Sequence, residues 1–203
     1  MKLILSFALP TLLGLLFQQF YNLMDTMIVG KLLGAQALAA VGSTNSISFF
    51  VIGFCTGVCS GFAIPVAQRM GAGDFSHMRR FVANAAYLAL GFSVVLTVLT
   101  GIFCDAILTV MNTPADIYAD AYAYIFIIFM GIPTTFLYNL LAGIIRSLGD
   151  SRTPVYFLAL ASLLNIGLDF ALILWFDTGV AGAAIATVIS QGVSGVACLA
   201  YMI

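Results

Sequence analysis

The chain has 203 residues, of which 63% are hydrophobic and only 7% are charged. Its mean hydropathy of +1.14 is far above that of soluble globular domains, which excludes the soluble enzyme classes. With seven Lys and Arg, eight acidic residues and one His, the chain also has too little charge for a nucleic-acid-binding surface. The composition therefore predicts a membrane protein with no nucleic-acid partner.

Apolar segments of about 20 residues, the length of a helix that crosses a bilayer, follow one another along the whole chain. They predict transmembrane helices over residues 3–29, 37–68, 81–104, 119–145, 153–176 and 179–203. We therefore expect residues 1–203 to form a single all-α, polytopic lobe of six transmembrane helices.

The first segment carries a polar stripe and a proline. Gln18, Tyr21 and Asp25 follow at spacings of three and four residues, which places them on one face of a helix. Pro10 cannot donate the helical hydrogen bond to the carbonyl of Ser6, so we expect the helix to bend there.

The second and fourth segments carry residues that affect packing and straightness. Gly53, Gly57 and Gly61 form a stripe of small residues, which favours close approach of a neighbouring helix. Pro133 lies inside the fourth segment, where it should produce a second bend.

The fifth and sixth segments carry further polar stripes. Ser162, Asn165 and Asp169 share one face of the fifth, and Ala183 and Thr187 share one face of the sixth. Counted from the helix ends at a rise of about 1.5 Å per residue, Asp169, Thr187 and the Asp25 of the first segment all lie roughly 9–12 Å below the same membrane surface. The three stripes can therefore meet.

An aspartate inside a membrane costs about 2.5–3.5 kcal/mol, so Asp25 and Asp169 need partners or protons. Two carboxylates with the amide of Asn165 and the hydroxyl of Thr187 offer only oxygen ligands, which suit Na⁺ or a shared proton and do not suit zinc. The sequence predicts a Na⁺ or H⁺ site at these residues. The alternative is that each aspartate only forms hydrogen bonds with a neighbouring helix.

Basic residues predict the orientation, because cytoplasmic loops of membrane proteins are enriched in Lys and Arg. Six alternating helices place Lys2 and the arginines of residues 69–80 and 146–152 on one side, and only Lys31 on the other. We therefore expect a multi-pass protein of the cytoplasmic (inner) membrane with both termini in the cytoplasm.

Two short motifs resemble those of intramembrane proteases but lack the context for catalysis. Residues 71–74 read Gly-Ala-Gly-Asp in a loop between arginines, and residues 192–195 read Gly-Val-Ser-Gly without a histidine in the membrane to act as base. The only histidine, His77, falls in the same loop as the first motif. We expect no enzyme activity.

Longer stretches resemble the multidrug and toxic compound extrusion (MATE) family. They are Ala8-Leu-Pro10, the run from Tyr21 to Gly30, Arg146-Ser-Leu-Gly-Asp-Ser-Arg-Thr-Pro154 and Asn165-Ile-Gly-Leu-Asp169. Members of this family have twelve helices in two lobes, so the resemblance implies that this chain is the amino-terminal lobe. A second six-helix lobe, absent from this chain, is then the expected partner.

The resemblance implies an antiporter that exports organic, often cationic, drugs or toxic compounds in exchange for Na⁺ or H⁺. The matched residues of the cation site are Asp25, Asn165, Asp169 and Thr187, with a backbone carbonyl from Ala183. Gln18 and Tyr21 match neighbours of that site on the substrate path, and Pro10 matches a bend that changes on protonation.

Small organic substrates, a monovalent cation and membrane lipids are the implied partners, and no cofactor is expected besides the coupling ion. The alternative function is a lipid-linked oligosaccharide flippase of the related superfamily. A flippase needs a more cationic cavity than we expect from helices that bury no Lys or Arg.

Overall fold

The computed structural model describes residues 2–203, except for the side chains of residues 2–8, 10, 11 and 15. Its elements are α1 (Lys2–Leu33), α2 (Ala35–Gly71), α3 (Phe75–Ile102), α4 (Cys104–Val110), α5 (Tyr118–Met130), α6 (Ile132–Ser147), α7 (Thr153–Phe170), the π-helical η1 (Ala171–Trp175) and α8 (Gly179–Met202). No strand occurs among these residues, so the all-α prediction is confirmed.

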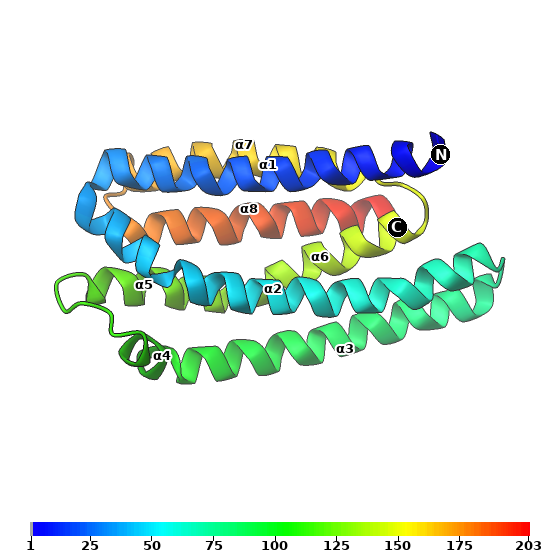
Figure 1. Cartoon of the computed structure of the whole chain (residues 1–203), viewed down its shortest axis with the longest axis horizontal. Helices are drawn as coiled ribbons and strands as arrows, with labels where there is room; N and C mark the ends of the chain where they lie inside the picture. Colours follow the sequence, from blue (N-terminus) through cyan, green and yellow to red (C-terminus); the bar gives the residue numbers. More distant parts are fainter. Residues whose placement is uncertain (1) are drawn as a thin grey trace.

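The long helices run side by side along one axis of the molecule (Figure 1). α6 packs against both α2 and α8, while α7 packs against α1 and α8. The buried core between them contains Phe129, Ile125 and Ile144 together with Val29 and Val41. Apolar residues also cover the exposed faces of these helices, as is typical of helices in a membrane, so apolar spacing alone does not select the buried face.

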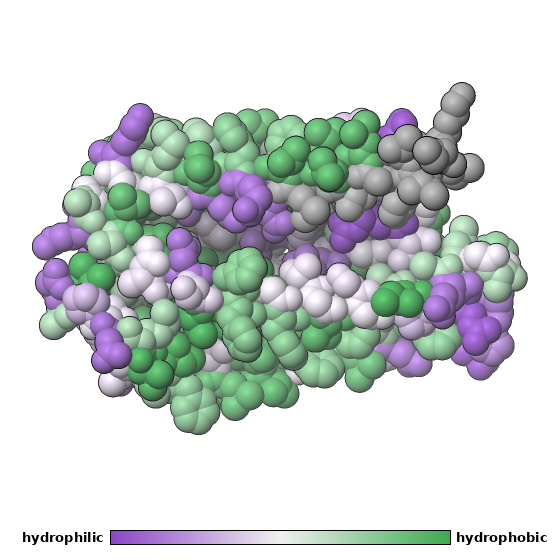
Figure 2. Space-filling model, in the orientation of Figure 1, coloured by the Kyte–Doolittle hydropathy of each residue, from purple (hydrophilic) through white to green (hydrophobic). Residues whose placement is uncertain are grey.

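The outer surface is apolar, as lipid contact requires. Phe49, Tyr87 and Trp175 are among many large hydrophobic side chains that are mostly exposed. Figure 2 shows hydrophobic residues over α3 and hydrophilic residues gathered near the α2–α3 turn. Within the described residues, α2, α3, α7 continued through η1, and α8 are long and apolar enough to span a membrane, and the bent pair of α5 and α6 makes a fifth candidate. The chain is an integral membrane protein.

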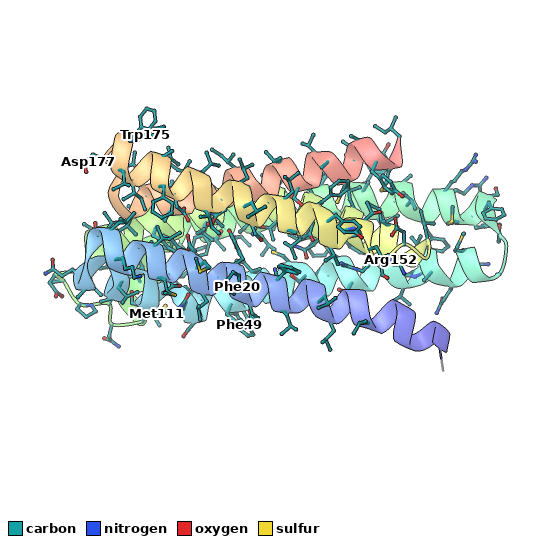
Figure 3. The ribbon with its side chains drawn as sticks, turned by 90° about the horizontal axis from the view of Figure 1, so that it is seen from above. Phe20, Phe49, Met111, Arg152, Trp175 and Asp177 are labelled. Carbon is teal, nitrogen blue, oxygen red and sulfur yellow. The ribbon has the colours of Figure 1, made fainter. Side chains whose placement is uncertain are left out.

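Both chain ends lie at one end of the helix bundle, together with the α2–α3 and α6–α7 turns (Figure 1). Arg152 marks this end in Figure 3, whereas Met111 and Asp177 lie at the opposite end. The arginines at residues 69–80 and 146–152 therefore share one end, which we call the basic end.

The α2–α3 turn at the basic end is held by Asp74, which caps α3. Its carboxylate accepts a hydrogen bond from the backbone N–H of His77 at 3.2 Å and contacts the His77 ring at 2.8 Å and Arg69 at 3.4 Å. The hydrogen bonds from His77 hold the pKa of Asp74 below its ordinary value. The protease-like sequence at residues 71–74 is thus a helix-capping turn.

The fourth predicted segment is divided at Gly131, where α5 and α6 meet at an angle of 45°. Pro133 stands in the first turn of α6, where its missing N–H leaves α5 unable to continue. The bend expected from Pro133 is therefore present. Gly131 also allows α8 to approach closely, because an added Cβ would lie 2.3 Å from Cγ2 of Val188.

We expect Gly131→Ala to destabilise the chain by about 1–3 kcal/mol, since the new methyl group forces the helices apart. The backbone of Gly131 has φ −80°, which alanine tolerates, so the cost arises from the contact with Val188. Thermal unfolding of the purified chain in detergent measures this effect. The second change Val188→Ala should restore most of the loss. Gly53→Ala, at a position with open space, is the control, and an equal loss in the control would contradict this explanation.

The glycine stripe of α2 does not serve the packing expected from the sequence within this chain. Gly53, Gly57 and Gly61 are exposed, and an added Cβ would meet no atom within 4 Å at any of them. The prediction of a close helix contact at this stripe is wrong for this lobe alone, because the helices that pack on α2 lie against its other faces.

Candidate functional site

The two intramembrane aspartates come together in the interior. Asp25 of α1 is 6% exposed and Asp169 of α7 is fully buried. Their carboxyl groups lie close enough to share a hydrogen bond. One oxygen of each, Oδ1, has no hydrogen-bond partner among the described residues. Two carboxylates in contact cannot both remain ionised unless a cation lies between them, and without one they share a proton.

Asn165 connects this pair to α8. It lies one turn before Asp169 and is fully buried. With its amide oriented so that both atoms find partners, Nδ2 donates to Oδ2 of Asp169 at 3.1 Å and Oδ1 accepts from the backbone N–H of Thr187 at 3.2 Å. Asp25, Asn165, Asp169 and Thr187 therefore form one cluster across α1, α7 and α8, as the helical spacing predicts.

Two tyrosines border the cluster. Tyr21 lies one turn before Asp25, and its buried hydroxyl faces Thr187 and both aspartates. Tyr124 of α5 is also buried near Tyr21 and the two aspartates. The sequence did not point to Tyr124, because its helix carries no polar stripe and its aromatic ring is equally typical of a core residue.

The other predicted site residues lie at different distances from the carboxylates. Ala183 is fully buried on α8, one turn before Thr187, where its carbonyl belongs to the helix. Gln18 is half-buried and lines a cavity beyond Tyr21. The side chain of Pro10 lies outside the described residues, so its predicted hinge remains a prediction.

The helix that carries Asp169 changes its geometry directly after the cluster. The π-helical η1 follows α7 without interruption, and Thr178 closes it by donating its hydroxyl to the carbonyl of Leu172 at 2.7 Å. Short π-helical segments are common at functional sites because they leave backbone groups available. An apolar run such as Ala171–Trp175 gives no indication of this change in the sequence.

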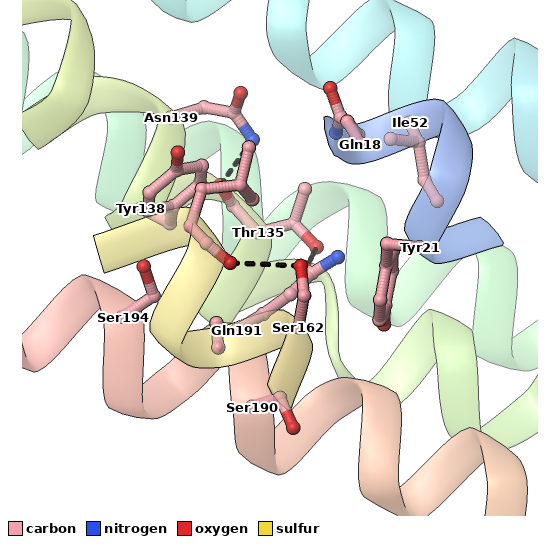
Figure 4. Close-up of a pocket in the computed structure, with 12 residues that line it drawn as sticks. Gln18, Tyr21, Ile52, Thr135, Tyr138, Asn139, Ser162, Ser190, Gln191 and Ser194 are labelled. Atoms are coloured by element: carbon pink, nitrogen blue, oxygen red, sulfur yellow. Dashed lines mark hydrogen bonds between the residues drawn. The ribbon is translucent and has the colours of Figure 1, made fainter. Parts of the chain in front are cut away.

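A small cavity lies beside Tyr21, between α1, α6, α7 and α8 (Figure 4). Its volume of about 20 Å³ is sufficient for a water molecule. The hydroxyl groups of Tyr21, Ser190 and Ser194 border it and have no hydrogen-bond partner in the described part of the chain. Opposite them, Thr135 donates to Oε1 of Gln191 at 2.7 Å. The cavity can therefore hydrogen-bond a polar group.

A larger cavity of about 270 Å³ lies next to the small one, on the side of the basic end. The two share Gln18, Tyr138, Asn139 and Leu158 in their walls. Arg146 of α6 lines the larger cavity and is half-buried. No Lys or Arg is buried among the side chains that the structure describes, as expected. The half-buried Arg146, at the end of an apolar helix, nevertheless gives this cavity a cationic residue in its wall.

Comparison with known proteins shows to which family the chain belongs. A family model described as MatE matches residues 10–171. The chain belongs to the MATE family. The probable multidrug resistance protein YpnP of Bacillus subtilis is 32% identical over 203 residues, which are 100% of this chain and 46% of YpnP. The probable multidrug resistance protein NorM of Thermotoga maritima is 30% identical and matches 100% of this chain and 44% of NorM.

Solved MATE structures share the fold. A MATE transporter in the outward-facing conformation superposes with a TM-score of 0.92 at 28% identity, over 99% of this chain and 44% of that protein. A transporter from Pyrococcus furiosus, described as having a binding pocket of reverse polarity, gives the same values. The chain spans about half the length of these relatives, which corresponds to one lobe of a MATE transporter.

Proposed function

We propose that this MATE lobe belongs to a cation-coupled antiporter that exports organic, often cationic, compounds in exchange for Na⁺ or H⁺. The observation that supports this most is the buried contact between Asp25 and Asp169, joined through Asn165 to Thr187. The names of the relatives support the export of drugs.

The cluster is suited to exchange because two buried negative charges without a bound cation have a high free energy. With the lobe closed around Asp25 and Asp169, a proton or Na⁺ offsets the repulsion between the carboxylates. When the cation leaves, two buried charges favour a conformation that hydrates them or brings a cationic substrate nearby. With a proton on the pair, the Asn165 amide donates to Asp169, whereas the opposite orientation of the amide turns its oxygen toward the carboxylates. That oxygen and the hydroxyl of Thr187 are neutral, so they would help to hold Na⁺ without adding charge.

The exposed glycine stripe of α2 supports a second lobe as the other wall of the substrate path. Small residues allow close helix contact in membranes, and Gly53, Gly57 and Gly61 have no neighbour within this chain that uses this property. In this proposal the basic end faces the cytoplasm, in accordance with its arginines, and the protein lies in the inner membrane.

Efflux of a cationic dye tests the proposal. Cells that lack their own efflux pumps, expressing the complete open reading frame, should lose preloaded ethidium faster than control cells. At fixed pH, stimulation by Na⁺ identifies Na⁺ coupling, and dependence on an imposed proton gradient without Na⁺ identifies H⁺ coupling. Efflux that depends on neither Na⁺ nor the proton gradient would contradict antiport.

Asn165→Ala and Thr187→Ala should each weaken the apparent affinity for the coupling cation about fivefold, with a smaller effect on maximal rate. Each change removes one neutral ligand, worth about 1 kcal/mol. The measurement is efflux rate against cation concentration. Thr26→Ala is the matched control, because the Thr26 hydroxyl donates to the carbonyl of Asn22 at 2.8 Å on the exposed side of α1. If both variants show the same cation dependence as the control, the polar residues of α1, α7 and α8 do not form a common cation site.

A further inference from the structure

Arg146 occupies an unusual position for a charged residue in this fold. It lies in the last turn of α6, and its half-buried side chain lines the 270 Å³ cavity between α1, α2, α6 and α7. The ion pairs formed within the described residues join Asp74 to Arg69 and to His77, and none involves Arg146. An arginine guanidinium remains charged at any physiological pH, so this wall of the cavity is permanently positive.

Asp150, the aspartate nearest to Arg146 in sequence, forms hydrogen bonds with other groups. Asp150 accepts hydrogen bonds from the backbone N–H groups of Arg152 and Thr153 at 3.0 and 3.1 Å, and from the hydroxyl of Tyr201 at 3.0 Å. These bonds fix the α6–α7 turn and attach it to α8. The remaining buried aspartates, Asp25 and Asp169, face each other in the cluster described above.

The rest of the cavity wall mixes apolar and neutral polar residues, and no acidic residue lines it in the described part of the chain. The neutral polar groups around Arg146 are Gln18, Thr56, Ser60, Tyr138, Asn139 and Ser151. Tyr138 already donates its hydroxyl to the carbonyl of Pro154, and Asn139 donates to the carbonyl of Thr135. The other amide and hydroxyl groups can donate to an oxyanion, and a guanidinium offers a fork of N–H donors that matches carboxylate or phosphate oxygens. A cation, by contrast, would find a like charge there and no carboxylate.

We propose that this cavity binds the anionic group, a phosphate or a carboxylate, of an organic molecule that enters from the basic end, with Arg146 as the main binding residue. Gln18, Tyr138 and Asn139 also line the small cavity beside Tyr21, so the two cavities are neighbours. In this proposal the remainder of a bound molecule lies on the side of the small cavity. The inference goes beyond cation coupling, because it concerns anion binding and requires no transport.

Binding of phenyl phosphate to the purified chain tests the proposal for a soluble ligand. Isothermal titration in detergent micelles should show binding of phenyl phosphate and none of the neutral phenyl glucoside. Arg146→Gln should weaken binding at least tenfold, since it removes a charge-assisted hydrogen bond. Arg146→Lys should retain weaker binding, because it keeps the charge but loses the fork. Arg79→Gln, an exposed arginine of α3 at the same end, is the control and should bind like the wild type.

Phosphatidylglycerol in mixed micelles tests a lipid headgroup as the source of the same chemistry. Native mass spectrometry should show it retained by the wild type and by Arg79→Gln and lost from Arg146→Gln, with diacylglycerol as the phosphate-free comparison.

Binding of phenyl phosphate or of phosphatidylglycerol that depends on Arg146 supports the proposal and identifies the source of the anionic group. The absence of binding in both arms, or equal binding by Arg146→Gln and Arg79→Gln, would overturn it. If Arg146→Gln fails to fold, Arg146→Lys takes its place. Weaker binding by Arg146→Lys than by the wild type supports the proposal, and equal binding overturns it. Dye efflux plays no part in these measurements, so a failure of antiport leaves this result intact.

Discussion

Asp25→Asn should abolish cation-coupled efflux while the protein still inserts into the membrane. The amide keeps the size of the carboxyl group and much of its hydrogen bonding, but it has no charge to balance a cation and no proton to release. Asp25 is buried against Asp169, so water does not substitute for the lost charge. We expect the efflux rate to fall by more than about tenfold, since a charge-assisted interaction contributes about 1.5–3 kcal/mol.

The measurement is dye efflux at saturating cation, together with the amount of protein in isolated membranes. Asp116→Asn is the matched control, because Asp116 is exposed in the turn before α5 and the change alters net charge by the same amount. Efflux like the wild type from correctly inserted Asp25→Asn would remove Asp25 from the coupling mechanism, whatever the geometry of the cluster.

The position of this cluster could be predicted from the sequence because helical spacing and membrane depth are both simple functions of residue number. Asn165 and Asp169 are four residues apart, so they share a face, and depth counted from the helix ends placed Asp25 and Thr187 at the same level. The high cost of a carboxylate in a membrane then indicated that both aspartates need partners, and a common cluster was one of the two arrangements that could supply them.

The boundaries of the helices were harder to predict, because hydropathy detects where a helix is apolar and not where its hydrogen bonds end. α3 begins at Phe75, six residues before the predicted span over 81–104, because the polar turn ends with the cap provided by Asp74. The same apolar run hides the division at Phe103 between α3 and α4.

Side-chain reach explains what else the sequence could not show. Tyr124 and Arg146 lie at positions set by the packing of α5 and α6, which meet at an angle of 45° at Gly131. Hydropathy places Arg146 at the end of a span, in water. Only the arrangement of α1, α2 and α7 around it shows that Arg146 lines a cavity. Long-range packing, and not local pattern, determines these contacts.

The contact between Asp25 and Asp169 should make the two carboxyl groups titrate as one pair. In the wild type, infrared spectroscopy should resolve two protonation steps that belong to the pair, and Na⁺ should alter both steps because it offsets the repulsion between the charges. Asp25→Asn or Asp169→Asn removes that repulsion, so the remaining carboxyl group should titrate in a single step that differs from either step of the pair.

Cation binding by the two single variants and the double variant gives an independent measure of the same contact. Because each aspartate acts through the other, the second substitution should cost much less than the first, with a coupling of about 0.5–3 kcal/mol as is usual for residues in contact. Asp116→Asn combined with Asp25→Asn is the control pair and should be additive, since Asp116 is exposed and belongs to the turn before α5. Additive losses for Asp25 and Asp169, with a surviving carboxyl group that titrates as it does in the wild type, would show that the two aspartates do not share a cation.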